Sequence, residues 1–146
     1  MEVNMDNNIN ILDELNKGCC MGIDSLNLII PKIDESKFRN LLEKQLIEYK
    51  DLSTRITDLY KEYTDTDIHE TNLMTKAMTW YGIEMDTMMD KSISNVADMF
   101  IKGTNMGIIE GKRLLNNKTM DKKVHKICKE YIKVQEAYLD KLKEYL

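Results

Sequence analysis

An internal repeat constrains the fold of this chain more than any other feature. The segments Asn10–Ile23 and Asn95–Ile108 are identical at seven of fourteen positions when aligned at an offset of 85 residues, and both contain Lys-Gly-x-x-Met-Gly-Ile. A weaker match at an offset of 82 places the Lys-x-x-x-Glu-Tyr run that ends at Tyr49 on the one that ends at Tyr131. Two copied helical hairpins therefore predict a bundle with a pseudo-two-fold axis.

Apolar side chains recur at helical spacing around both copies. In the second predicted helix the steps of four and three residues form a heptad pattern that only Gln45 interrupts. Its expected core positions are Phe38, Leu42, Gln45, Tyr49, Leu52, Ile56, Leu59 and Tyr63. Those of the last helix are Val124, Ile127, Tyr131, Val134, Tyr138 and Leu142. The predicted helices cover about 8–30, 36–63, 92–115 and 120–146.

The lengths of the links between these helices predict how they are arranged. Short links, the first of which contains the single proline, Pro31, join the helices into two antiparallel hairpins. The middle link, 64–91, is long enough to cross the bundle and is expected to contain a short helix. We therefore predict an all-α, single-domain ferritin-like four-helix bundle over 1–146. Methionines and a tryptophan gather in the crossover: Met74, Met78, Trp80, Met85, Met88 and Met89.

Composition narrows the classes of function. The chain of 146 residues has 21 Lys and Arg against 25 Asp and Glu, and its net charge of −4 does not point to nucleic acid or an anionic membrane. Two histidines are few for metal or acid–base chemistry. Three cysteines, no apolar leader and no apolar run of membrane-spanning length make a reduced, cytoplasmic protein the expectation.

The Leu-x-Lys-Gly-x-x-Met-Gly-Ile-Asp-x-Leu segment resembles the first helix of the ferritin-like superfamily, in particular small bacterial rubrerythrin-related and coat-protein-like members. In that superfamily a Glu metal ligand commonly follows such a glycine, and the next helix carries Glu-x-x-His. The resemblance therefore implies a di-iron site at the middle of the bundle. It also suggests a spore-forming bacterium, and a spore-associated location is the second expectation.

The ligand positions carried over from this resemblance hold other residue types. They form our candidate central site: Cys19, Leu46, Tyr49, Thr104, Cys128 and Tyr131. A di-iron carboxylate site needs four carboxylates and usually two histidines, so we expect no metal and no cofactor here. Nearby acids and histidines do not restore the ligand set: Asp24, Glu48, His69, Glu110, His125 and Glu130.

Residues at equal distances on either side of a hairpin turn lie at the same height in the bundle. The turns therefore predict that Cys19 faces Tyr49 and that Thr104 faces Tyr131. The tyrosines would fill the volume of the lost metal, and their hydroxyls would bond to Thr104, a carbonyl or water. Glycines spaced four residues apart are interpreted as helix-packing positions that make room for a bulky neighbour. These glycines are Gly18, Gly22, Gly103 and Gly107, and Gly111 continues the row.

Three functions remain open on the sequence. The first is a non-enzymatic structural or interaction protein, with a homodimer or protein partner bound through a helical face or the Met-rich crossover. The second is soft-metal binding or redox sensing by Cys19 and Cys128, although two thiols alone make a poor zinc site. The third is a small apolar ligand in the centre of the bundle, which requires an internal cavity.

Overall fold

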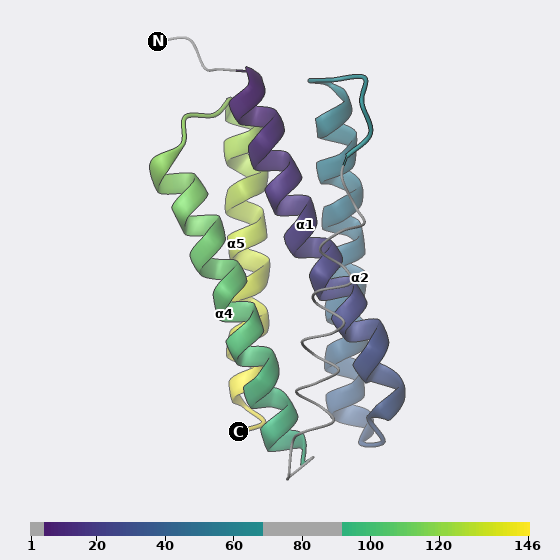
Figure 1. The fold of residues 1–146 in the computed structure, drawn as a ribbon. Coiled ribbons are helices and arrows are strands. Elements are labelled where there is room, and N and C mark those ends of the chain that lie inside the picture. Colours follow the sequence, from purple (N-terminus) through teal and green to yellow (C-terminus); the bar gives the residue numbers. More distant parts are fainter. Residues whose placement is uncertain (1–4, 69–91) are drawn as a thin grey trace.

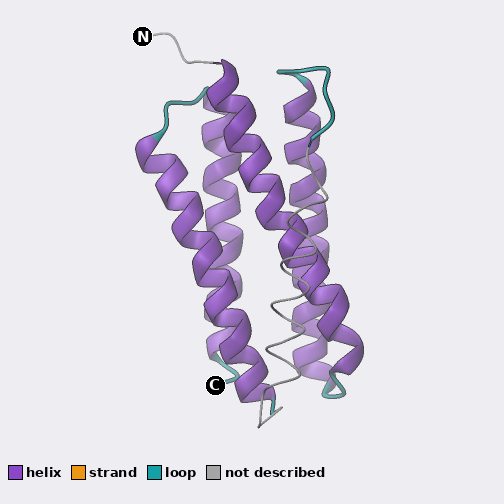
Figure 2. Cartoon of the chain, viewed as in Figure 1, coloured by secondary structure: helices purple, strands orange, loops and turns teal. Residues whose placement is uncertain are grey.

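The computed structural model describes residues 5–68 and 92–146, and helices account for most of both segments (Figures 1 and 2). No strand occurs within these residues, so the prediction of an all-α, four-helix arrangement is confirmed. The predicted short helix in the crossover and the Met-rich cluster lie outside the described residues. The elements are α1 (Met5–Ile29), the short 3-10 helix η1 (Ile30–Lys32), α2 (Ser36–Lys61), α4 (Ile93–Asn117) and α5 (Lys122–Lys143).

The helices form two antiparallel hairpins that lie side by side. Helix α1 packs mainly on α2, and α4 packs mainly on α5. Between the hairpins, α5 contacts both α2 and α1, whereas α1 and α4 touch less extensively. Helix α2 ends at one end of the bundle and α4 begins at the opposite end, so these two helices run in the same direction (Figure 1).

Local sequence accounts for where the first hairpin turns. Pro31 stands in the first turn of η1, where its missing N–H costs no helical hydrogen bond. Glu35 then caps α2, because its carboxylate accepts hydrogen bonds from the backbone N–H groups of Lys37 (3.1 Å) and Phe38 (2.7 Å). Ser92 caps α4 in the same way through the N–H of Asn95.

The buried faces of α2 and α5 follow the predicted spacing with two exceptions. Tyr63 lies beyond the end of α2 and is half-buried, while Tyr60 is buried instead. On α5, Gln135 is buried and Val134 is only half-buried. Residues three and four positions after Tyr131 both lie near its face of the helix, so either could have occupied the buried position. None of the helices in the described residues has the combined length and apolar character that crossing a membrane requires.

Polar bonds tie the two hairpins together at the end of the bundle where α5 begins. The backbone N–H of Asp121 donates to Asn8 Oδ1 (2.8 Å), and Tyr63 Oη donates to Asp121 Oδ2 (2.8 Å). Asn8 is almost fully buried at the start of α1. Asp121 therefore links the first turns of α1 and the segment after α2 to the N-terminus of α5.

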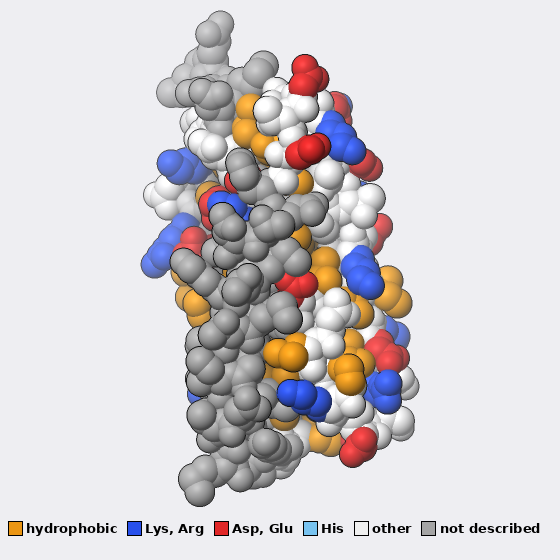
Figure 3. Space-filling model, turned by 45° about the vertical axis from the view of Figure 1, so that its right-hand side comes forward, with side chains coloured by type: hydrophobic (Ala, Val, Ile, Leu, Met, Phe, Trp, Pro, Cys, Tyr) orange, Lys and Arg blue, Asp and Glu red, His pale blue; other side chains and the backbone are white. Residues whose placement is uncertain are grey.

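Charged side chains of both signs are interspersed over the face of the molecule shown in Figure 3. Ion pairs within one helix turn occur on both α1 and α2, where Lys17 pairs with Glu14 and Arg39 pairs with Glu43. Such exposed pairs each contribute only a few tenths of a kcal/mol, roughly 0.3–0.5.

Candidate functional site

Tyr131 occupies the middle of the bundle and is 3% exposed. A Cβ atom built on Gly18 of α1 would lie 2.0 Å from the Tyr131 hydroxyl oxygen. From the other side, Cβ atoms on Gly107 and Gly111 of α4 would lie 3.3 Å from the hydroxyl oxygen and from the ring, respectively. The tyrosine therefore fills space that glycines on two helices leave open.

Tyr49 has an equivalent environment in the other hairpin. A Cβ atom on Gly22 would lie 2.6 Å from its ring, and the ring meets Tyr138 edge to face with centroids 6.3 Å apart. Gly22 corresponds to Gly107 in the repeat, just as Tyr49 corresponds to Tyr131. Each hairpin thus places a glycine of its first helix against the buried tyrosine of its second.

Gln135 connects the two tyrosines. Tyr49 Oη donates a hydrogen bond to Gln135 Oε1 across the interface between α2 and α5 (2.7 Å). The Gln135 side chain also hydrogen-bonds to Tyr131, one turn earlier on the same helix. Burial raises the pKa of Tyr131 well above its ordinary value, and the bond from Gln135 opposes that rise only in part. The Tyr131 hydroxyl therefore stays protonated at neutral pH.

The structure differs from the expectation in two ways: in the hydrogen-bond partner of the Tyr49 hydroxyl, and in the level along the first helix of each hairpin that the tyrosine faces. The Tyr49 hydroxyl donates to Gln135 on α5, whereas the expected partner was Thr104, which is buried on α4. Gly22 and Gly107, which lie against the tyrosines, are three residues after Cys19 and Thr104. One helical turn therefore separates the observed register from the predicted one, since a turn contains 3.6 residues.

Cys19 and Cys128 are both fully buried and free. Burial raises the pKa of Cys19 far above its ordinary value and raises the pKa of Cys128 to about 11. The Cys128 thiol also points toward the Gly111 carbonyl oxygen, 3.6 Å away. Because the thiolate is the form that binds metals and attacks electrophiles, neither cysteine is prepared for either role at neutral pH.

The remaining predicted residues lie at the margin of this centre. Leu46 on α2 is half-buried and packs against the core, and Gly103 on α4 is half-buried. Their positions are those of packing residues. The central site that the structure assembles consists of Tyr49, Tyr131 and Gln135 with the glycines beneath the rings.

The sequence did not single out a second polar pair, in which the half-buried Ser53 donates through Oγ to Asn16 Oδ1 (2.6 Å) between α2 and α1. Asn16 is completely buried, and its Nδ2 has no hydrogen-bond partner among the described residues. Spacing alone could not have identified Asn16 or Gln135: Asn16 lies one residue after Leu15 of the α1 core, and Gln135 competes with Val134 for the position one turn after Tyr131. Their polar character alone gave no reason to expect burial.

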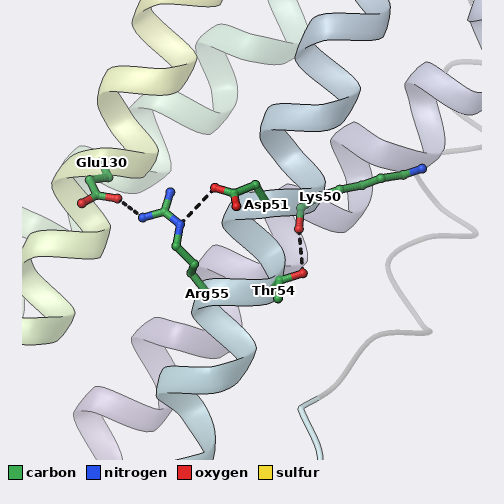
Figure 4. A network of polar contacts seen from close by, with 5 residues as sticks. All are labelled: Lys50, Asp51, Thr54, Arg55 and Glu130. Carbon is green, nitrogen blue, oxygen red and sulfur yellow. Dashed lines mark hydrogen bonds and ion pairs between the residues drawn. The ribbon is translucent and has the colours of Figure 1, made fainter.

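The acidic and histidine side chains near the candidate site point elsewhere. Glu48 and His125 are exposed, and Glu130 forms an ion pair with Arg55, which also contacts Asp51 at 3.1 Å (Figure 4). Within residues 5–68 and 92–146, no three His, Cys, Asp or Glu side chains lie close enough together to hold a metal ion. His69 lies outside the described residues.

The geometry of this centre favours packing over chemistry. Its hydroxyl and amide groups bond to one another, and its thiols are protonated at neutral pH. We compared the chain with known proteins: it matches no protein-family model, no curated protein and no solved structure.

Proposed function

We propose that this protein is a non-catalytic ferritin-like bundle that serves as a structural or interaction protein. The observation that carries the proposal is the hydrogen bond from Tyr49 to Gln135 beside Tyr131, which fills the middle of the bundle with phenol and amide groups. In the resemblance stated above, the same middle layer would hold carboxylates and histidines. A buried layer of this kind contributes to a single, well-ordered packing and offers no open coordination position.

The directions of the helices support the ferritin-like part of the proposal. Helices α2 and α4 run in parallel, and α1 and α5 run in the opposite direction (Figure 1). Two antiparallel hairpins with this relation need one connection that spans the length of the bundle, which is the arrangement of ferritin-like folds. The glycine–tyrosine pair that recurs in both hairpins supports descent from a duplicated hairpin.

The test is the metal chemistry of the whole protein. The chain is purified without chelator, its iron, manganese and zinc are measured, and oxygen consumption is followed after addition of ferrous iron. We expect much less than one metal ion per chain and iron oxidation no faster than in buffer. A ferritin-like protein that retains its carboxylate ligands serves as the positive control. Stoichiometric iron or rapid oxidation would overturn the proposal.

The two alternative functions have less support. Thiol chemistry at Cys19 and Cys128 would require thiolates, and burial raises the pKa of both thiols. An apolar ligand in the centre would compete for space with Tyr49 and Tyr131, whose rings lie against glycine backbone. The spore coat is the proposed setting only through the resemblance to coat-protein-like proteins, and a fluorescent fusion in a sporulating host would test it.

A further inference from the structure

Four lysines form a straight row along the outward face of α5. Lys122, Lys126, Lys129 and Lys133 are all exposed and are separated by four, three and four residues. This spacing places them on one side of the helix. With a rise of 1.5 Å per residue, the row is about 17 Å long. We call these four residues the lysine stripe.

The lysine stripe differs from the other lysines of α5 in its ion pairing within the described residues. The three other lysines of α5 each have a carboxylate nearby: Lys123 lies 3.0 Å from Glu62, Lys141 lies 3.8 Å from Glu144, and Lys143 lies 4.0 Å from Asp140. In residues 5–68 and 92–146, no ion pair involves a member of the stripe. Four positive charges are therefore concentrated on a protein whose net charge is −4.

A shallow groove runs between α2 and α5 along one edge of the stripe. Lys126 belongs to both, and the apolar side chains of Leu59 and Ile127 contribute to the groove lining. Arg55 reaches across the groove to Glu130, so these two charges compensate each other (Figure 4). Leu59 and Ile127 are each less than a tenth exposed, so the groove offers a small apolar contact beside the stripe, and the Arg55–Glu130 pair does not oppose the charge of the stripe.

We propose that the lysine stripe and this groove bind an acidic helical segment of a protein partner. The proposal rests on the non-catalytic interaction role given above. A helix with carboxylates at positions i, i+4, i+7 and i+11 would place one acid opposite each lysine, and an apolar side chain at its edge would contact Leu59 and Ile127. The excess of unpaired positive charge would speed association with such a segment and fix its register.

The surroundings of the stripe favour a protein segment over other anions. Glu130 lies beside the row and pairs with Arg55, and Glu136, three residues after Lys133, ends the row and pairs with Lys112, so the positive surface is limited to the four lysines. None of the aromatic side chains in the described residues is exposed, so no platform for base stacking adjoins the stripe. A helix with regularly spaced carboxylates fits this line of charge better than a broad anionic surface such as a membrane.

The experiment measures binding of a fluorescein-labelled helical peptide with four Glu at i, i+4, i+7 and i+11 and a Leu at its edge. A peptide of the same composition with the Glu residues distributed around the helix is the register control. The stripe variant is K122Q/K126Q/K129Q/K133Q. The matched variant is K32Q/K37Q/K44Q/K50Q, which loses the same charge. Its four lysines are exposed, lie outside α5 and form no ion pair in the described residues. Circular dichroism establishes that both variants are folded.

We expect the stripe variant to bind the patterned peptide at least about tenfold more weakly than the parent, and the matched variant to lose less than about twofold. Binding should weaken as NaCl rises from about 50 to about 300 mM. Equal losses in both variants, equal binding of the two peptides, or no binding of the parent below about 1 mM peptide would each overturn the proposal.

Single-stranded DNA and phosphatidylserine vesicles complete the test. Tighter binding of either than of the patterned peptide, lost in the stripe variant, would show that the stripe serves a different anion and would overturn the proposal. The metal measurements above are independent of these results. If the lysine stripe does not bind the patterned peptide, the proposed non-catalytic role still stands. Stoichiometric iron in the purified protein would overturn that role.

Discussion

The hydroxyl oxygen of Tyr131 lies 2.0 Å from the position that a Cβ atom on Gly18 would occupy. These residues belong to α5 and α1, which come from different hairpins, so the contact joins the two halves of the repeat. No real Cβ atom tolerates such a separation, because dispersion attraction turns to repulsion well outside it. The close approach of α1 to α5 therefore depends on the absence of a side chain at position 18.

Replacing Gly18 with Ala should destabilise the protein by about 1–3 kcal/mol, although Ala in a helix interior is normally favoured over Gly. In a Tyr131→Phe background the cost should shrink, because the nearest remaining ring atom, Cζ, lies 3.0 Å from the new Cβ. Urea unfolding followed by circular dichroism measures both steps. An equal cost of Gly18→Ala in the two backgrounds would show that the hydroxyl contact is not its cause.

Gln135→Leu should lower the free energy of unfolding by about 1–3 kcal/mol, because it removes the acceptor of the Tyr49 hydroxyl in a buried place. Adding Tyr49→Phe should restore part of the loss, since the hydroxyl that lost its Gln135 acceptor is then gone. Gln45→Leu is the matched control, because Gln45 is also buried but its Nε2 has no hydrogen-bond partner in residues 5–68 and 92–146. We expect that control to be neutral or stabilising. Equal losses for the two glutamines would contradict this account.

Asn8→Ala should cost about 1–2 kcal/mol, because Asn8 Oδ1 accepts from the backbone N–H of Asp121. Asn10→Ala is a suitable comparison, since Asn10 is exposed on the same helix and its replacement should change stability by less than about 0.5 kcal/mol. Amide hydrogen exchange offers a second measurement. Exchange of the Asp121 amide should accelerate in Asn8→Ala but not in Asn10→Ala. Similar protection of this amide in the two variants would argue against the hydrogen bond from Asp121 to Asn8.

Burial raises the pKa of Asp24, one of whose carboxylate oxygens has no hydrogen-bond partner in the part of the chain that the structure describes. The folded protein then holds this proton to higher pH than the unfolded chain does. The contribution of Asp24 to stability therefore falls as pH rises from the unfolded value of about 3.9 through the raised folded pKa. Asp24 is half-buried and keeps part of its hydration, so the penalty should stay below about 1 kcal/mol.

Asp24→Asn should consequently be more stable than the parent near neutral pH and equal to it near about pH 3. Thermal unfolding across this range measures the difference. Asp58→Asn, at an exposed position of α2, controls for the loss of one negative charge. A stability difference that is the same at every pH would show that ionisation of Asp24 is not responsible.

Cys19 and Cys128 should resist alkylation in the folded protein, because both are buried and burial raises their pKa values. At about pH 7.5 we expect iodoacetamide to react at least about a hundredfold more slowly than in urea. A Cys20→Ser variant makes the signal of Cys19 unambiguous in peptide mass spectra. Rapid native reaction, or joint protection of both thiols by zinc or copper(I), would instead support the thiol function.

Tyr49 and Tyr131 show how much of the candidate site could be predicted from the sequence. The repeat identified both as equivalent positions on the second helix of each hairpin, and both are buried there. The glycine that each one meets lies one turn away from the predicted partner, because turn midpoints define the pairing of two helices only to within a turn. Periodicity thus determined the buried face but not the register between helices.

Gln135 and Lys126 show what periodicity leaves undecided. A step of three or of four keeps a residue on the core face, so spacing could not choose between Val134 and Gln135. The choice depends on the Tyr49 hydroxyl, which arrives from the other hairpin. Lys126 is one of several basic residues near the start of α5, and only the packing of α2 against α5 shows which of its neighbours have carboxylate partners.

The sequence alone determined that this chain forms helices and which positions mostly face inward, because these properties depend on residue spacing along the chain. The tertiary structure alone decided which side chains meet at the centre and which lysines stay unpaired. Those outcomes depend on the rotation and height of one helix against another, which many weak contacts settle together.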